Sequence, residues 1–142
     1  MSNVYLLVLL TYVSWGALLA LTVVMIRTIR VLQGKNKSND FPADREHGEG
    51  FYRRAMRAHL NTIENLILAA PVLLVAYFSK IIDHNVETWA LVLLGARLGQ
   101  SITHLLGLSE WHVNVRFAFF LAQLTSLGVM IYYLAGHLKL FG

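Results

Sequence analysis

The chain alternates between long apolar segments and shorter polar ones. Four apolar segments dominate, covering about residues 4–26, 51–79, 87–108 and 113–140. A helix needs roughly 20 apolar residues to cross the hydrocarbon core of a bilayer, and each segment reaches that length. Backbone groups in lipid must be hydrogen-bonded internally, and no alternating strand pattern is present. We therefore predict four membrane helices.

The links between these segments predict how the helices are connected. The first link, 33–48, is polar and contains glycine and proline, so it is expected to be a loop. The other two links are short, which places consecutive helices antiparallel. We predict an all-α, up-down four-helix transmembrane bundle forming one domain over residues 1–142. The expected helices cover about residues 3–32, 49–79, 86–107 and 112–140.

Composition supports a membrane protein and restricts its chemistry. Hydrophobic residues make up 56% of the chain and charged residues only 14%, less charge than a soluble domain of this size exposes. The chain contains no cysteine, which excludes disulfides, thiolate metal sites and a cysteine nucleophile in the protein. Any thiol chemistry therefore requires a thiol carried by a ligand.

The basic residues are unevenly placed. The formal charge is +4, and eight of the twelve Lys and Arg residues lie between Arg27 and Arg57, around the first loop. Positive residues between two membrane segments indicate a cytoplasmic loop, and this location argues against nucleic-acid binding. We expect a multi-pass protein of a bacterial inner membrane, or of an endoplasmic reticulum-type membrane, with the first loop in the cytoplasm.

Polar residues form a stripe at the start of the second expected helix. In "RAMRAHLNTIEN" (54–65), Arg54, Arg57, Asn61 and Glu64 are spaced by 3, 4 and 3 residues, which places them on one helix face. Ionisable groups within membrane segments usually face the bundle interior and pair with one another. We expect Arg57 to pair with Glu64, with Asn61 as a bridge.

The third and fourth expected helices carry polar residues at the same end of the bundle. The up-down topology brings these residues into one leaflet, so they are expected to converge. Such a group is either a packing network or an anion site, and three arginines against one glutamate favour the anion. The residues are Arg57, Asn61 and Glu64 from the second helix, Arg97, Gln100 and His104 from the third, and Arg116 from the fourth.

The second helix also carries a recognisable motif. "RAHLNTIEN" (57–65) resembles the pattern Arg-Ala-(His or Gln)-x-Asn-x-x-Glu of the MAPEG family, the membrane-associated proteins in eicosanoid and glutathione metabolism. Three further stretches resemble the same family: "ARLGQSITH" (96–104) in the third helix, "FFLAQL" (119–124) in the fourth, and "PADREHG" (42–48) in the first loop. The resemblance covers nearly the whole chain.

This resemblance implies a function and a set of site residues. Family members are homotrimers that bind glutathione between adjacent subunits in the cytoplasmic leaflet, and a lipophilic second substrate arrives from the bilayer. Arg116 corresponds to the arginine that stabilises the thiolate, and no metal is implied. The glutathione-binding residues implied here are Arg30 (or Arg27 in its place), Arg54, Arg57, His59, Asn61, Glu64, Arg97, Gln100 and His104, with His59 directed toward a neighbouring subunit.

The sequence leaves the reaction open. A glutathione thiolate serves conjugation to a lipophilic electrophile, reduction of a lipid hydroperoxide, or isomerisation. A second class of function is a non-catalytic, lipid-binding member of the same family. A third is a haem electron carrier with His59 and His104 as the paired ligands, although excess arginine suits an anionic peptide better than haem iron.

Overall fold

A computed structural model describes residues 3–42 and 47–140, and its architecture is all-α. Four helices follow one another along the chain, α1 (Val4–Leu32), α2 (Gly50–Phe78), α3 (His84–Leu106) and α4 (Glu110–His137). The predicted all-α four-helix fold is confirmed, and the expected helix bounds lie within about three residues of these. The "PADREHG" resemblance in the first loop falls largely on residues 43–46, outside the described ranges.

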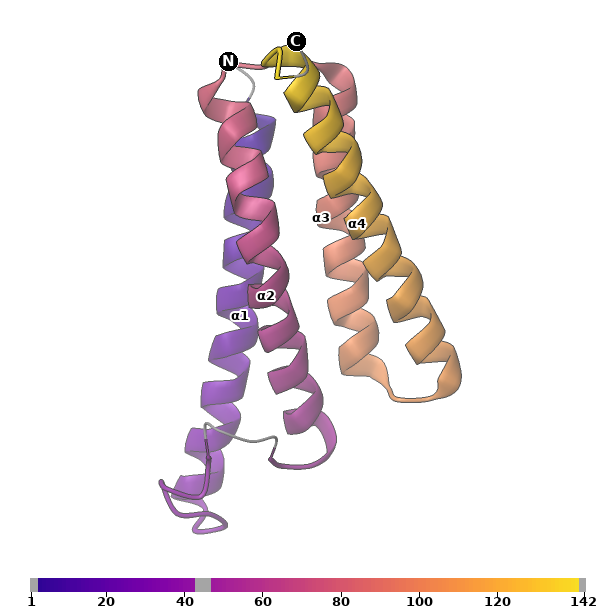
Figure 1. Ribbon diagram of the computed structural model, residues 1–142. Coiled ribbons are helices and arrows are strands. Elements are labelled where there is room, and N and C mark those ends of the chain that lie inside the picture. Colours follow the sequence, from indigo (N-terminus) through magenta and orange to yellow (C-terminus); the bar gives the residue numbers. More distant parts are fainter. Residues whose placement is uncertain (1–2, 43–46, 141–142) are drawn as a thin grey trace.

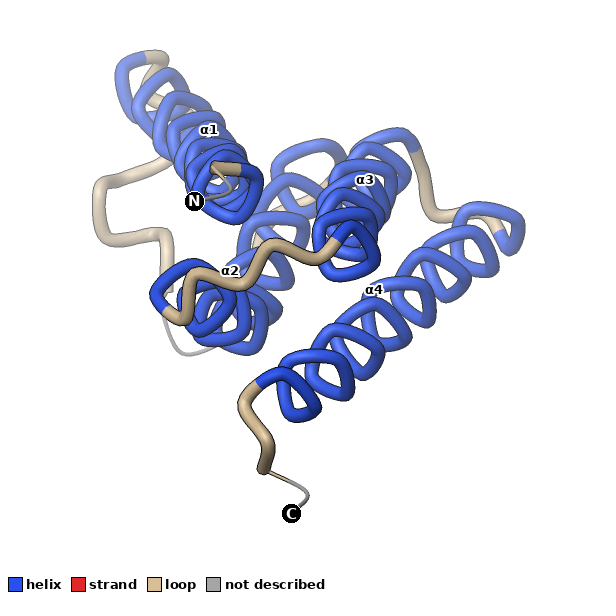
Figure 2. Tube along the Cα trace, turned by 90° about the horizontal axis from the view of Figure 1, so that it is seen from above, coloured by secondary structure: helices blue, strands red, loops and turns tan. Residues whose placement is uncertain are grey.

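The helices run up and down and form two antiparallel pairs. Figure 1 shows both chain ends beside the α2–α3 turn at one end of the bundle, and the first loop and the α3–α4 turn at the other. α1 packs mainly against α2, and α4 packs mainly against α3, while α1 and α4 make no contact within the described ranges. Seen along the bundle, α4 lies on the side of α3 away from α1 (Figure 2).

The apolar core is concentrated toward the end that carries the two termini. All four helices contribute to it, for example through Tyr12, Leu73, Leu93 and Met130. A smaller cluster near the first loop joins Val23 of α1 to Tyr52 and Met56 of α2, and α4 contributes nothing to it. All four helices are therefore packed together at the end with the termini, whereas near the first loop α3 reaches the α1–α2 pair through Leu105 at the edge of the smaller cluster.

The outer surface is suited to lipid. Large apolar side chains are exposed along the helices, including Leu10, Ile67, Phe117 and Tyr132, and a continuous exposed apolar surface marks contact with a membrane or another chain. Three helices, α1, α2 and α4, are long and apolar enough to cross a membrane. α3 has 23 residues, about 34 Å at ~1.5 Å per residue, but carries the polar positions that lower its hydropathy.

Candidate functional site

A cavity of about 490 Å³ opens between the start of α2 and the facing ends of α3 and α4. Its volume lies in the range of pockets that hold drug-sized ligands. Its lining is strongly basic, with four arginines and a histidine against one carboxylate. The lining residues are Glu49, Gly50, Arg53, Arg54, Arg57, His104, Leu108 and Arg116.

The start of α2 determines which of its residues reach this cavity. Glu49 is extended, and Gly50 has a positive φ of 58°, a conformation that glycine adopts without steric cost. The chain therefore turns sharply into the helix, and Glu49 and Gly50 end at the cavity rim. Arg53 lies one turn further along α2, and Arg57 follows at the helical spacing of four residues.

Arg54 connects α2 to α3. Its Nε donates to the backbone oxygen of Leu105 at 2.9 Å. The last carbonyls of a helix have no partner within the helix, so a basic side chain that binds one satisfies a free acceptor and favours the helix dipole. Arg54 thus fixes the end of α3 beside the start of α2 and defines one wall of the cavity.

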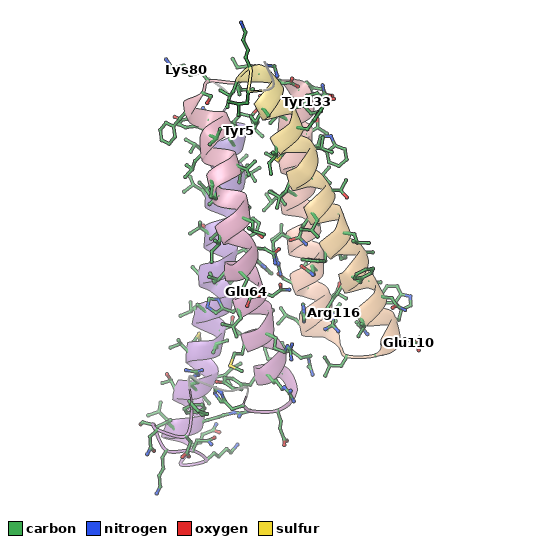
Figure 3. The ribbon with its side chains drawn as sticks, viewed as in Figure 1. Tyr5, Glu64, Lys80, Glu110, Arg116 and Tyr133 are labelled. Carbon is green, nitrogen blue, oxygen red and sulfur yellow. The ribbon has the colours of Figure 1, made fainter. Side chains whose placement is uncertain are left out.

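Arg116 and His104 form the opposite wall. Arg116 Nη1 donates to His104 Nδ1 at 3.0 Å. A guanidinium has donors only, so Nδ1 must be the acceptor, and a neutral His104 carries its proton on Nε2. Figure 3 shows Arg116 near the first-loop end of α4, between α4 and α3. The pair therefore presents one guanidinium and one imidazole to a cavity that is already basic.

Gln100 was predicted at the ligand site, but it does not line this cavity. Only 4% of its surface is exposed, and its Nε2 donates to the backbone oxygen of Arg116 at 3.2 Å. Its Oε1 accepts from Gln123 Nε2 at 3.0 Å. Gln100 therefore joins α3 to α4 from within the bundle, and it supports the helix turn that carries Arg116.

Arg97 was also predicted at the site and is instead wholly buried. Its Nε and Nη2 each donate to Ser101 Oγ at 3.3 Å, and its Nη1 donates to the backbone oxygen of Asn61 at 3.2 Å. Within the described ranges no carboxylate forms an ion pair with it. The guanidinium is thus a buried link between α2 and α3, about two helix turns from His104 along α3.

The predicted polar stripe on α2 does not face the cavity along its whole length. The helix buries a neighbouring face made largely of small residues, including Ala55, Ala58 and Thr62, because small side chains let helices approach closely. Asn61 does not bridge Arg57 and Glu64 as predicted, because Glu64 makes no hydrogen bond with another described residue. The Asn61 Oδ1 instead accepts from Asn65 Nδ2 at 3.0 Å.

Three more of the predicted ligand residues lie away from the cavity within one chain. Glu64 is exposed at mid-height on α2 (Figure 3), and it makes no ion pair with another described residue. His59 Nδ1 donates to the backbone oxygen of Gly16 on α1 at 3.1 Å. Arg30 lies at the end of α1, with its guanidinium 5.2 Å from the ring centre of Tyr52.

Sequence reasoning missed Glu49 and Arg53. Arg53 is adjacent to Arg54 and therefore off the predicted stripe, and Glu49 was predicted only as the first residue of the second helix, ahead of that stripe. The signal that identifies both is the positive φ at Gly50, which a sequence does not specify. Of the predicted set, the cavity brings together Arg54, Arg57, His104 and Arg116.

This arrangement suits an anion. Arginine binds carboxylates through two parallel hydrogen bonds, and several guanidinium groups around one space favour a ligand with more than one carboxylate. A guanidinium next to a thiol also lowers the pKa of that thiol. No group of three or more His, Asp or Glu within the described ranges is placed to hold a metal ion. His59 turns to α1 and His104 to α4, so the two do not form a ligand pair within the chain.

Comparison with known proteins agrees with the sequence motifs. The family model for the MAPEG family matches residues 5–136. That match covers all four helices except the first residue of α1 and the last of α4. Among curated proteins, none matches the chain.

Proposed function

Because the chain belongs to the MAPEG family, which includes glutathione-dependent transferases, we propose that it is a glutathione-dependent membrane transferase. The observation that carries the proposal is the basic cavity, in which four arginines and His104 surround a space of about 490 Å³. Glutathione carries two carboxylates, one amine and one thiol, and the protein itself contains no cysteine. The ligand therefore supplies the sulfur nucleophile, and the chain supplies the charges that hold it.

The cavity residues divide into two roles. Arg53, Arg54 and Arg57 lie on the α2 side and bind the carboxylates, and Glu49 at the rim is the partner for the amine. Arg116, on the α4 side, faces the thiol and stabilises its thiolate. A cysteine-type thiol has an ordinary pKa near ~8.5, so lowering that pKa raises the thiolate fraction at neutral pH.

The reaction follows from this arrangement. The thiolate attacks a lipophilic electrophile that arrives from the bilayer, a carbon–sulfur bond forms, and the displaced group leaves with the electron pair of the broken bond. The product is a thioether conjugate. Reduction of a lipid hydroperoxide uses the same thiolate, with a second glutathione completing the disulfide. Conjugation is the reaction we test first because it needs one glutathione per turnover.

A second copy of the chain completes this proposal. The exposed carboxylate of Glu64 is costly at mid-height of a membrane helix unless a partner covers it. His59 also lies outside the cavity of its own chain. We propose a homotrimer in which these residues meet glutathione at the neighbouring subunit, with the first loop and the cavity on the cytoplasmic side of a bacterial inner membrane.

Thiolate absorbance in the ultraviolet tests the site. Adding glutathione to the purified protein at neutral pH should produce a saturable thiolate signal. Arg116→Ala should lose most of it while retaining binding measured by calorimetry. Lys80→Ala, a cation removed at the opposite end of the bundle, is the matched control and should keep both.

Two results separate the possible failures of this proposal. Glutathione that binds without a thiolate signal in the wild type would favour the non-catalytic, lipid-binding class. Absence of any glutathione binding in the wild type would refute the proposed function.

A further inference from the structure

A second basic depression lies at the end of α1, apart from the cavity described above. Its volume is about 460 Å³, and it shares no lining residue with the arginine-rich cavity. It is lined by Ile26, Ile29, Arg30, Gln33, Lys35 and Asn36. The lining therefore combines two cations and two carboxamides with two aliphatic side chains, and it contains no carboxylate.

A specific turn builds this depression. Gly34 has a φ of 67°, and its N–H donates to the oxygen of Val31 at 2.9 Å, while the N–H of Lys35 donates to the oxygen of Arg30 at 3.0 Å. These two hydrogen bonds define the Schellman motif, in which a left-handed residue, usually glycine, reverses the chain after a helix. The reversal places Lys35 and Asn36 beside the last turn of α1, next to Arg30.

The depression lies at the depth of lipid headgroups. α1 has 29 residues and is about 44 Å long at ~1.5 Å per residue. A bilayer is roughly 30 Å thick across its hydrocarbon and about 40–45 Å including headgroups. A helix that crosses the membrane at this length therefore ends among the headgroups, and the last turn of α1 brings Arg30 to that level.

The side chains are arranged like the two parts of a phospholipid. Ile26 and Ile29 line the depression and precede Arg30 along α1, and Ile29 is 48% exposed, so they present an apolar surface to the acyl chains. Above it, Arg30 and Lys35 present cations and Gln33 presents amide donors. The Arg30 side chain is held in place by the ring of Tyr52, 5.2 Å from the guanidinium carbon.

We propose that this depression binds the phosphate headgroup of an anionic phospholipid, with the acyl chains along Ile26 and Ile29. Clusters of basic residues next to a membrane helix attract anionic lipids, and here the cluster is concave and placed over an apolar surface. The site is separate from the glutathione cavity and does not depend on the proposed enzymatic activity. It gives Arg30 a ligand within its own chain.

Lys37 provides a control for general charge attraction. It lies in the same loop as Lys35, but it does not line the depression, and its N–H donates to Asp40 Oδ2 at 2.6 Å. A diffuse basic surface would respond equally to the loss of either lysine. A built site responds to Lys35→Gln and is unaffected by Lys37→Gln.

Native mass spectrometry of the detergent-purified protein tests this proposal, with palmitoyl-oleoyl phosphatidylglycerol and phosphatidylcholine as the two probes. We expect the wild type to retain phosphatidylglycerol several-fold better than phosphatidylcholine. Lys37→Gln should show the same preference as the wild type. Lys35→Gln should lose most of this preference. Gly34→Val should lose it too, because a β-branched residue disfavours the positive φ that forms the turn.

The contrary results are distinct. Equal effects of Lys35→Gln and Lys37→Gln would show diffuse attraction and overturn the site. Displacement of phosphatidylglycerol by inorganic phosphate would assign the depression to a free anion and overturn the lipid. Loss of helical circular dichroism in Gly34→Val would mean that this variant does not fold. The comparison of Lys35→Gln with Lys37→Gln then tests the site by itself, since neither substitution changes the backbone. Lys35→Gln should bind glutathione to the same extent as the wild type, so a failure of the lipid site is distinguishable from a failure of the proposed function.

Discussion

Asp83 stabilises the end of the bundle that lies opposite the arginine-rich cavity. Its Oδ1 accepts from the backbone N–H of Asn85 at 2.7 Å and of Val86 at 3.4 Å, which caps the start of α3. Its Oδ2 accepts from His137 Nε2 of α4 at 2.7 Å. One carboxylate therefore performs two tasks, and two substitutions separate them. Asp83→Ser keeps a capping oxygen, whereas Asp83→Ala removes the cap and the link to α4.

The size of each contribution follows from typical values for such contacts and from their exposure. Loss of a capping side chain costs about 1 kcal/mol of the free energy of unfolding. The link to α4 contributes about 0.5 kcal/mol, because the His137 side chain is 42% exposed and exposed pairs are screened by water. We therefore expect Asp83→Ala to lose about 1.5 kcal/mol by adding these terms. Asp83→Ser and His137→Ala should each lose about 0.5 kcal/mol.

The same contacts make stability depend on pH. The hydrogen bond from His137 lowers the pKa of Asp83 most, burial opposes it, and the backbone N–H groups of Asn85 and Val86 lower the pKa further. The folded pKa thus lies below the unfolded value of about 3.9. The contribution of Asp83 is complete above that value and is lost as pH falls through the folded pKa.

Reversible unfolding in mixed detergent micelles, followed by far-ultraviolet circular dichroism, measures these differences. The gap between wild type and Asp83→Ala should be largest at neutral pH and should close in acid. A gap that stays constant down to pH values well below the ordinary carboxyl pKa would refute the linkage. Equal losses in Asp83→Ser and Asp83→Ala at neutral pH would refute the capping role. Glutathione binding should be unaffected in both variants.

Two further predictions concern stability elsewhere in the bundle. Lys80 has a φ of 56° at the end of α2, a conformation that costs an L-residue about 1–2 kcal/mol, so Lys80→Gly should raise the free energy of unfolding by about 1 kcal/mol. An unchanged free energy of unfolding in Lys80→Gly would show that the conformation of Lys80 carries no strain. Gln123→Leu removes the donor to the buried Gln100 Oε1 and should cost about 1–3 kcal/mol. Gln100→Leu/Gln123→Leu should recover part of that loss, and a double variant worse than the sum would contradict the pairing.

The lengths of the apolar segments were sufficient to predict the four helices, because the thickness of a bilayer sets the length of a helix that crosses it. The ends of the helices were less predictable. α2 ends at Phe78, and Lys80, two residues later, has a left-handed conformation that lysine rarely adopts. α3 begins two residues earlier than expected because Asp83 caps it. Both boundaries depend on a few local hydrogen bonds, which the hydrophobic pattern of the sequence does not reveal.

Helical spacing predicted which polar residues share a face of α2, but not how far that face turns toward the other helices. The helix buries Ala55 and Ala58, since small residues permit close packing, and this rotation places Arg57 at the cavity and leaves Glu64 exposed. The burial of Arg97 was likewise unpredictable, because its partners include a backbone oxygen of α2. A spacing rule identifies neighbours along one helix, whereas a site is formed between helices.

The central claim is that Arg116 activates a glutathione thiol in the basic cavity. The rate of glutathione conjugation to a generic aromatic electrophile, measured against pH, tests it most directly. The wild type should show a thiol pKa well below the ordinary value of ~8.5, and Arg116→Ala should be slower, with its profile shifted back toward that value. Equal rates and equal pH profiles in the two proteins would contradict the account.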